Sequence, residues 1–253
     1  MTKDALPAAW ILAGGLGTRL SAAVPDRPKA LALVDGRPFL DILLDELAAA
    51  GFGRCLLLLG SRHQAILEFV RQRRDRGQRP GGDITIDTSV EPEPLGTGGA
   101  LRHARAHAGD GEPFFVLNGD TTVQLRPEAL LARHRDTGAL VTIAAVEHAD
   151  TRRFGRLDVT PDGFVRGFRE KSSDASPGLI NAGVYLVEPA VLSWIAEDRP
   201  VSLEQEVFPR LVAEGHRLAV VTQPGELHDI GTPDGLASFV AFTRRTAAAK
   251  NQD

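Results

Sequence analysis

Short apolar runs alternate with helical patterns along the first half of the chain. The runs Ala8–Ala13, Cys55–Leu59 and Pro113–Leu117 have the length and composition of buried parallel strands. Phe39–Ala50 instead places its apolar residues at helical spacing and is followed by Gly51, a common helix C-cap. The other elements predicted here are the helices His63–Arg74 and Thr97–Ala108 and the strand Asp83–Asp87. This alternation predicts an α/β fold with a doubly wound, mostly parallel sheet.

The pattern changes after about residue 140. The strand-like runs Leu140–Glu147, Gly155–Val159 and Phe164–Glu170 follow one another closely, and Pro161-Asp162-Gly163 is a turn sequence between two of them. The remaining predicted elements are the strands Ile180–Val187 and His216–Thr222 and the helices Leu203–Ala213 and Pro233–Ala249. No linker-like stretch or internal repeat is evident. We therefore expect a single domain over residues 1–253, with an inserted, smaller and more antiparallel lobe.

Composition narrows the class of protein. The chain has 253 residues, of which 43% are hydrophobic and 25% charged, as in ordinary soluble proteins with ample core. Its net charge of −4 provides no overall basic field for nucleic acid. Cys55 is the only cysteine, so we expect a buried strand thiol and no disulfide. The apolar run beside Lys3 and Asp4 is too short for a secretion signal or a membrane span. These features predict a cytoplasmic protein without membrane or nucleic-acid partners.

A basic segment, Arg71–Arg79, lies at the end of a predicted helix. Cations at that end are favoured by the helix dipole. The segment therefore favours a solvated helix face, and the alternative is a contact with an anion or with another subunit of a homo-oligomer.

The segment Trp10–Leu20, WILAGGLGTRL, carries the first candidate site. Its strand breaks into Gly14-Gly15-Leu16-Gly17, and a helix is predicted to begin at Thr18. Glycines let backbone N–H groups approach a ligand, and a helix N-terminus attracts phosphate. Arg19 and Lys29 add two cations, one that binds oxygens in a fork and one that acts as a point charge. The segment predicts a polyphosphate site, and the alternative is an ordinary turn between strand and helix.

Two familiar phosphate-binding motifs do not fit this turn. A P-loop requires Gly, four residues and then Gly-Lys-Ser/Thr, and the chain contains no such run. The dinucleotide fingerprint requires a third glycine three residues after Gly17, and Leu20 occupies that position. A dinucleotide-dependent oxidoreductase is therefore disfavoured.

Two aspartates follow strand-like runs. Asp120 comes after Asn118-Gly119 at the carboxyl end of a predicted strand, where open α/β sheets bind ligands. Asp229 lies in a turn before Gly231-Thr232-Pro233. Mg²⁺ prefers one or two carboxylates together with phosphate oxygens, so both aspartates are candidate metal ligands. The alternative for each is a helix cap or an Asx-turn, most of all for Asp229, because the Gly-Thr-Pro that follows it typically begins a helix.

Seven motifs together resemble one family. They are ILAGGLGTRL with Pro28-Lys29, Pro94–Ala100, Asn118-Gly119-Asp120, Phe154-Gly155, Glu170-Lys171, Asn181-Ala182-Gly183 and Asp229–Pro233. In this order, from Ile11 to Pro233, they resemble the motifs of the sugar-1-phosphate nucleotidyltransferases. The resemblance implies a Rossmann-like, GT-A-like nucleotidyltransferase fold. It also implies a nucleotide-binding half over about 1–139, a sugar-binding half over about 140–232 and a C-terminal helix over 233–249.

The resemblance further implies a reaction and its residues. A sugar 1-phosphate oxygen attacks the α-phosphorus of a nucleoside triphosphate and pyrophosphate leaves, so positioning and charge neutralisation carry the catalysis. Arg19, Lys29 and Asp120 are the implied catalytic residues, and Asp120 and Asp229 are the implied Mg²⁺ ligands. The implied nucleotide-binding residues are Leu12, Gly14, Gly15, Gly17, Thr18, Glu91, Glu93, Gly96, Thr97 and Gly98. The implied sugar-phosphate-binding residues are Asn118, Gly155, Glu170, Lys171, Asn181 and Gly183. Taken alone, Glu170-Lys171 would favour ordinary surface charge.

The base and the sugar depend on weaker signals. LGTGGA, LINAGVYL and SLEQEVFPRL most resemble the members that transfer a guanylyl group from GTP to D-glycero-α-D-manno-heptose 1-phosphate. A carboxylate of Glu91 or Glu93 suits the N1–H and N2–H₂ donors of guanine, and the alternative is two acidic residues in an exposed proline loop. Phe154 stands where the family commonly has tyrosine, so a contact of that hydroxyl is lost if it exists.

Other functions stay open. Within the family the rivals are mannose 1-phosphate guanylyltransferases and the uridylyltransferases for muramate or glucose 1-phosphate. A different class is a catalytically silent homologue that binds nucleotide sugars and regulates a partner. The joint presence of Arg19, Lys29, Asp120, Lys171 and Asp229 argues against a silent homologue.

Overall fold

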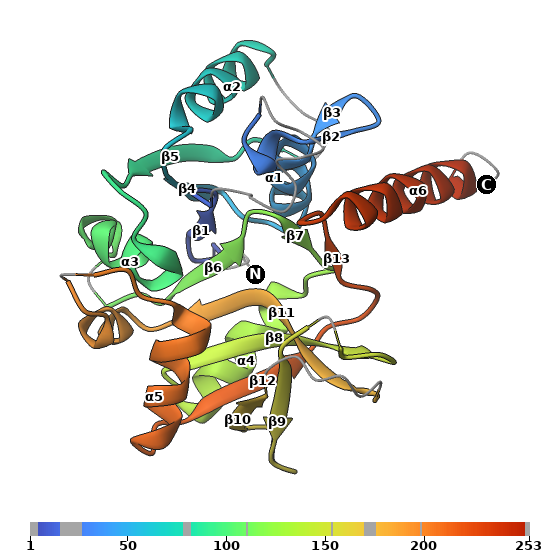
Figure 1. Cartoon of the computed structure of the whole chain (residues 1–253). Helices are drawn as coiled ribbons and strands as arrows, with labels where there is room; N and C mark the ends of the chain where they lie inside the picture. Colours follow the sequence, from blue (N-terminus) through green and yellow to red (C-terminus); the bar gives the residue numbers. More distant parts are fainter. Residues whose placement is uncertain are drawn as a thin grey trace.

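The computed structural model describes residues 5–15, 27–77, 82–109, 111–152, 154–169, 176–197 and 199–250. Within these ranges nine strands form one sheet in the order β10-β9-β11-β6-β1-β4-β5, with β8 pairing with β11 and β12 pairing with β8 (Figure 1). Helices cover both faces of the sheet, so the predicted α/β class is confirmed. None of the helices described is long and apolar enough to cross a bilayer.

The first half supplies the parallel part of the sheet. β1 (Ala9–Leu12) lies between β4 (Arg54–Leu59) and β6 (Phe114–Asn118), and β5 (Thr85–Val90) pairs with β4. The helices of this half are η1 (Lys29–Leu31), α1 (Phe39–Ala49), α2 (His63–Asp75), α3 (Gly96–His103) and η2 (Arg105–His107), and a short hairpin joins β2 (Leu33–Val34) to β3 (Arg37–Pro38). All four strands of this parallel part end at one edge, where a ligand can contact every one of them.

The second half is built on a long antiparallel strand, β11 (Gly178–Val187). One side of β11 pairs with β8 (Val141–His148), and the other pairs first with β9 (Arg156–Val159) and then with β6. The register shifts between Asn181 and Tyr185, so a bulge lies where β11 passes from one neighbour to the next. The other elements here are β10 (Val165–Arg169), β12 (Leu218–Thr222), α4 (Pro127–Thr137), η3 (Pro189–Trp194), the π-helical turn η4 (Leu203–Val207) and α5 (Phe208–Ala213).

The end of the chain returns to the first half. β13 (His228–Asp229) pairs with β7 (Thr121–Thr122), directly after β6, and α6 (Pro233–Lys250) then extends away from the body (Figure 1). This pairing brings the last predicted motif beside Asp120.

Alternating side chains divide the core between the two faces of the sheet. Ala9 and Ile11 of β1 pack with α1 and α2 on one face, and Trp10 packs with α3 and α5 on the other, where it stacks on Phe114 at 4.1 Å between ring centroids. Because both faces of these parallel strands are buried, their sequences are continuously apolar, as the sequence pattern indicated.

Several element boundaries differ from the prediction. The strand expected at Asp83–Asp87 runs over Thr85–Val90 instead, because its register is set by pairing with β4. The helix expected over Thr97–Ala108 divides at Ala104 into α3 and η2. The sequence analysis also missed α4, although its signals are present: a proline at the first helical turn and Gly138 at the C-cap with φ +57°. The helix expected to begin at Thr18 lies outside the described residues.

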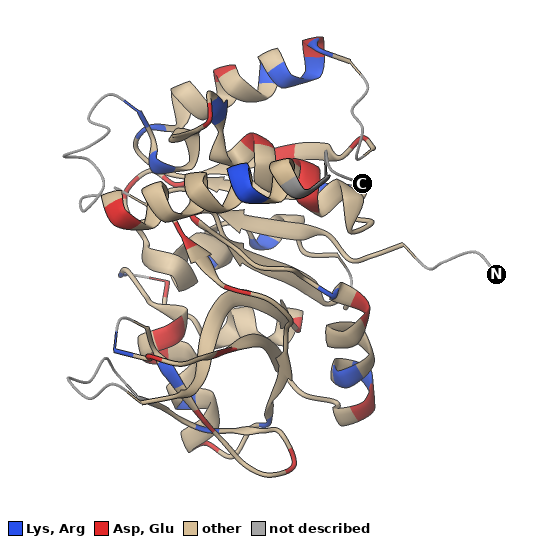
Figure 2. Cartoon of the chain, turned by 90° about the vertical axis from the view of Figure 1, so that its right-hand side faces the viewer, with Lys and Arg blue, Asp and Glu red and all other residues tan. Residues whose placement is uncertain are grey.

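The basic segment at the end of α2 is only partly a solvated face. Arg73 is buried and forms ion pairs with Asp41 and Asp45 of α1, and Arg74 donates to the Ile86 carbonyl oxygen at 2.7 Å. These arginines therefore fasten α2 to α1 and β5. Elsewhere on the face shown in Figure 2, basic residues are interspersed with acidic ones, as expected without an overall basic field.

Candidate active site

Three glycine-containing turns meet at the carboxyl ends of the parallel strands. Gly14 follows β1, Gly60 follows β4 and Gly119 follows β6. A Cβ added to Gly60 would lie 2.5 Å from the Gly14 carbonyl oxygen, and one added to Gly119 would lie 2.6 Å from the Leu12 carbonyl oxygen. The Gly119 N–H donates to that Leu12 oxygen at 2.9 Å. Backbone thus approaches backbone directly, and a side chain at either position would push the strand ends apart.

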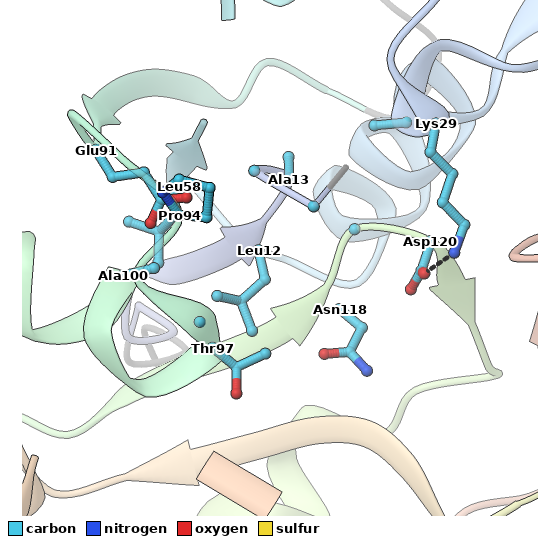
Figure 3. A pocket seen from close by; sticks show the side chains of 15 residues that line it. Leu12, Ala13, Lys29, Leu58, Glu91, Pro94, Thr97, Ala100, Asn118 and Asp120 are labelled. Atoms are coloured by element: carbon cyan, nitrogen blue, oxygen red, sulfur yellow. Dashed lines mark hydrogen bonds and ion pairs between the residues drawn. The ribbon is translucent and has the colours of Figure 1, made fainter. Parts of the chain in front are cut away.

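These turns border a cavity of about 490 Å³ at the edge of the parallel sheet (Figure 3). Many of the residues predicted for the site line it: Leu12, Gly14, Gly15, Lys29, Glu91, Gly96, Thr97, Asn118 and Asp120. Figure 3 shows Lys29 and Asp120 at one end of the cavity and Glu91, Leu58 and Pro94 at the other. Gly17, Thr18 and Arg19, which were predicted to complete the phosphate site, lie outside the described residues.

Lys29 and Asp120 form an ion pair at one end of the cavity (Figure 3). Lys29 begins η1 directly after Pro28, and Asp120 follows β6 after the single residue Gly119. The two side chains are 15% and 32% exposed. A partly exposed pair of this kind contributes little to stability, and both of its residues line the cavity, where a ligand can meet the two charges. An ammonium suits phosphate oxygens, and a carboxylate suits a divalent cation bound to them.

Asp229 lies beside this pair. The Ile230 N–H donates to the Asp120 carbonyl oxygen at 3.0 Å, and β13 pairs with β7 next to Asp120. A Cβ added to Gly231 would lie 2.6 Å from both Asp229 Oδ1 and Lys29 Nζ, so both groups border the same small space. Asp229 Oδ1 also accepts a hydrogen bond from the Gly231 N–H at 2.6 Å, which is the turn contact expected as the alternative. The turn therefore holds the carboxylate toward Lys29.

The two carboxylates fit a hard cation that a substrate completes. Within the described ranges, no group of three or more His, Cys, Asp or Glu residues gathers as a self-sufficient metal site. Asp120 and Asp229 offer only oxygen donors, which Mg²⁺ prefers, and Mg²⁺ usually takes its other ligands from water and phosphate.

Glu91 and Glu93 differ in their positions. Glu91 is partly buried at the far end of the cavity, where its carboxylate accepts from the Leu95 N–H at 3.3 Å and packs against Gly14 and Gly60. Burial raises the pKa of Glu91 above its ordinary value. Glu93 is exposed and is not among the described residues that line the cavity. Of the two predicted carboxylates, only Glu91 faces this space.

Val201 packs against the first turn of α3. A Cβ on Gly96, whose φ is +75°, would lie 2.5 Å from the Val201 carbonyl oxygen, and that oxygen accepts from the Gly98 N–H at 2.8 Å. Gly98, one of the implied nucleotide-binding residues, is therefore buried against Val201 and is not among the described residues that line the cavity. Thr97 faces the cavity from the first turn of α3 (Figure 3).

Residues predicted for the sugar gather at the seam between β6 and β11. A Cβ on Gly183, whose φ is +70°, would lie 2.5 Å from Asn118 Nδ2. The Asn181 side chain accepts from the Gly183 N–H at 2.9 Å, and the Asn181 N–H donates to the Gly155 carbonyl oxygen at 3.2 Å. The structure thus brings together Asn118, Gly155, Asn181 and Gly183. Glu170 and Lys171 lie outside the described residues, immediately after β10.

The sequence analysis missed a polar cluster that joins the two halves. Glu204, in the π-helical turn η4, accepts hydrogen bonds from Thr97 and from Tyr185. A helix-start signal was available, because Ser202 accepts from the Gln205 N–H as an N-cap. That signal predicts a helix start and says nothing about the partners of Glu204.

Comparison with known proteins agrees with this geometry. The nucleotidyl transferase family model matches residues 8–246. "Probable mannose-1-phosphate guanylyltransferase 3" of Oryza sativa subsp. japonica is 35% identical over 95% of this chain and 66% of its own length. The chain spans roughly two thirds of the curated relatives that it matches.

Solved structures give the same result. The crystal structure of HddC from Yersinia pseudotuberculosis is 29% identical, with a TM-score of 0.80, over 94% of this chain and 100% of that one. The structure of the same protein complexed with GMP-PN is 30% identical, with a TM-score of 0.78, over 92% and 97%. The chain therefore belongs to the nucleotidyl transferase family.

Proposed function

We propose that this protein is a sugar-1-phosphate guanylyltransferase, which joins GTP to a sugar 1-phosphate and releases pyrophosphate. The observation that carries the proposal is the grouping of Lys29, Asp120 and Asp229 at one end of a glycine-bordered cavity. Family membership excludes the dinucleotide-dependent oxidoreductase. A catalytically silent homologue would have no need of these three charges in one place.

The proposed reaction is a single displacement. An oxygen of the sugar 1-phosphate bonds to the α-phosphorus of GTP, the bond from that phosphorus to the bridging oxygen of the β-phosphate breaks, and pyrophosphate leaves with the electron pair. Lys29 neutralises charge on the reacting and departing phosphates, and Arg19 is proposed to act with it. Positioning of two substrates and charge neutralisation account for catalysis, so no protein side chain is needed as a nucleophile.

Asp120 and Asp229 are proposed to hold Mg²⁺. Both carboxylates border the space beside Lys29, and both are oxygen donors of the kind Mg²⁺ prefers. When bound there, Mg²⁺ neutralises charge on phosphate oxygens. The carboxylates themselves fix the end of the cavity at which the triphosphate lies.

Guanine is proposed to occupy the opposite end, beside Glu91. A carboxylate accepts the N1–H and N2–H₂ of guanine together, a pattern that adenine, cytosine and uracil do not present. The relatives support a guanine nucleotide, because one is named a guanylyltransferase and another was solved with GMP-PN. Gly14, Gly15 and Gly96, with Gly17 and Thr18, are proposed to contact the nucleotide between these two ends.

The proposed acceptor is D-glycero-α-D-manno-heptose 1-phosphate. Its support is the resemblance of LGTGGA, LINAGVYL and SLEQEVFPRL to heptose-specific members of the family. Asn118, Gly155, Asn181 and Gly183 would face its hydroxyls, and Glu170 and Lys171 would bind its hydroxyls and phosphate. Mannose 1-phosphate is the second candidate, because the curated relatives are named mannose-1-phosphate guanylyltransferases. The two sugars share the manno ring, and the heptose has one more carbon.

A substrate matrix tests the proposal. Pyrophosphate release is measured with Mg²⁺, each of GTP, ATP, CTP and UTP, and the 1-phosphates of the heptose, mannose and glucose. We expect release with GTP and the heptose 1-phosphate to exceed every other pair. Release with mannose 1-phosphate alone would reassign the acceptor, and release with UTP alone would overturn the guanylyl assignment. A folded protein that releases no pyrophosphate with any pair would support the silent homologue.

A further inference from the structure

The only tyrosine of the chain lies at the centre of the polar cluster between the halves. Tyr185 is fully buried on β11, just after the bulge, and its hydroxyl accepts from Asn181 Nδ2 at 2.9 Å. The same hydroxyl donates to Glu204 Oε1 at 3.1 Å. Asn181, a residue proposed for the sugar, is therefore oriented by Tyr185, and Tyr185 is oriented by Glu204.

The other oxygen of Glu204 reaches the nucleotide loop. Glu204 Oε2 accepts from Thr97 Oγ1 at 2.9 Å and from Ser202 Oγ at 3.0 Å. Thr97 Oγ1 in turn accepts from the Leu203 N–H at 2.8 Å, so side chain and backbone both join this loop to η4. Thr97 lines the cavity in which GTP is proposed to bind.

The Glu204 carboxylate thus contacts Thr97 of the proposed nucleotide site directly and reaches Asn181 of the proposed sugar site through Tyr185. Its Oε1 accepts from Tyr185 and its Oε2 from Thr97 and Ser202, so loss of the carboxylate would remove the acceptor of three hydroxyl donors. The π-helical turn that carries Glu204 is a geometry often found at functional sites. Nothing in the proposed reaction chemistry requires Glu204 itself.

We propose that Glu204 is a positioning residue that couples the two substrate sites, so that GTP bound against Thr97 orders Asn181 for the sugar 1-phosphate. The inference rests on the proposed guanylyl transfer. Ordering the shared cluster costs conformational entropy. The first substrate to bind orders it, so the second binds without that cost. By linkage, each substrate strengthens binding of the other by the same factor.

The charge of the cluster supports this arrangement. Burial and the neighbouring carboxylate of Glu204 raise the pKa of Tyr185 well above its ordinary value, and Asp120 contributes in the same direction. Tyr185 therefore stays a neutral hydroxyl that donates to Glu204, and the direction of the chain of hydrogen bonds is fixed.

The test measures coupling between the two ligands. Binding of a GTP analogue whose bridge between the α- and β-phosphates cannot be cleaved is measured by calorimetry with and without saturating sugar 1-phosphate, in the wild-type protein and in Glu204→Ala. We expect the sugar phosphate to tighten analogue binding about fivefold or more in the wild type, and to have almost no effect in Glu204→Ala. Glu204→Gln, which keeps the shape and one acceptor, is expected to retain part of the coupling.

Two further variants separate positioning from folding. Glu206→Gln makes the same substitution on the same turn, at a carboxylate that pairs with Arg199, and is expected to retain full coupling. Tyr185→Phe breaks the path to Asn181 and is expected to raise the KM for sugar 1-phosphate while leaving analogue binding alone unchanged. Unchanged coupling in a folded Glu204→Ala or Glu204→Gln protein, or no coupling in an active wild type, would overturn the inference. A wild type that binds neither substrate would instead refute the proposed function.

Discussion

The two proposed halves of the site differ in what fixes their shape: backbone contacts in one and side-chain hydrogen bonds in the other. In the proposed nucleotide half, strand ends approach so closely at Gly60 and Gly119 that backbone contacts fix the turns that border the cavity. In the sugar half, the corresponding seam is organised by side chains, with Asn181, Tyr185 and Glu204 linked by hydrogen bonds. The shape of the first half depends on a few glycines that allow backbone to approach backbone. The shape of the second half depends on side chains that the fold brings together from distant segments.

The difference suggests a division of roles. Closely packed backbone has few alternative arrangements, so we expect the described turns at Gly14, Gly60 and Gly119 to keep their shape when a ligand binds. Hydrogen-bonded side chains lose rotamer freedom when they are ordered, which makes the sugar end responsive to the ligand in its neighbour.

The largest effect is expected from the charges at the phosphate end. Lys29→Ala and Asp120→Ala are each expected to lower turnover at least a hundredfold, roughly 3 kcal/mol or more of lost transition-state stabilisation. Steady-state pyrophosphate release measures this, and thermal unfolding confirms that each variant is folded. Near-normal turnover in either folded variant would remove that residue from the mechanism.

A glycine-to-alanine substitution, which adds one methyl group, tests whether close backbone contacts fix the turns of the proposed nucleotide half. In Gly60→Ala the new Cβ meets the Gly14 carbonyl oxygen, so we expect unfolding free energy to fall by about 1–3 kcal/mol and GTP binding to weaken. Denaturant unfolding and calorimetry measure the two effects. Gly53→Ala is the control, because its added Cβ meets no atom within 4 Å. Equal unfolding free energies and equal GTP binding in the two variants would contradict close backbone packing at Gly60.

Base recognition at Glu91 is expected to give a selective effect. Glu91→Gln replaces one acceptor oxygen by an amide donor, so the preference for GTP over ATP should fall about tenfold, the value of one lost good hydrogen bond. Comparing kcat/KM for the two nucleotides measures the preference, with Glu93→Gln as the matched control on the exposed side of the same loop. Loss of the preference for GTP in Glu93→Gln but not in Glu91→Gln would assign base recognition to Glu93 and contradict the proposal.

The smallest effect is a pH dependence of GTP binding. Guanine is proposed to bind the charged form of Glu91, whose pKa is raised by burial, so lowering the pH protonates it earlier than an ordinary glutamate. We expect the KM for GTP to rise a few-fold as the pH falls through this raised pKa, and the rise to be absent in Glu91→Gln. A wild-type KM that stays flat over the acidic range would argue that Glu91 does not bind guanine as a carboxylate.

The sequence predicted the nucleotide half well because its signals are local. Apolar runs marked β1, β4 and β6, and glycines after β1 and β6 marked two of the turns that border the cavity, whereas Gly60 after β4 was not singled out. The approach of Asp229 to Lys29 followed only from family resemblance, since no local pattern predicts that β13 pairs with β7.

The sugar half was harder to predict for a physical reason. Thr97 and Glu204 are 107 positions apart, and their contact depends on how η4 packs against α3. The two-residue strands β7 and β13 are likewise too short for a periodic pattern. Conversely, Arg73 was expected to face solvent with its neighbours, and only tertiary packing against α1 shows that it is buried.

The central claim is that a sugar-phosphate oxygen attacks the α-phosphorus of GTP. Sugar 1-phosphate labelled with heavy oxygen in its phosphate group is incubated with GTP, Mg²⁺ and the protein, and both products are analysed by mass spectrometry. The account predicts that all of the label appears in the guanosine-diphosphate sugar and none in pyrophosphate. Label in pyrophosphate, or the absence of any nucleotide sugar from a reaction with folded protein, would contradict it.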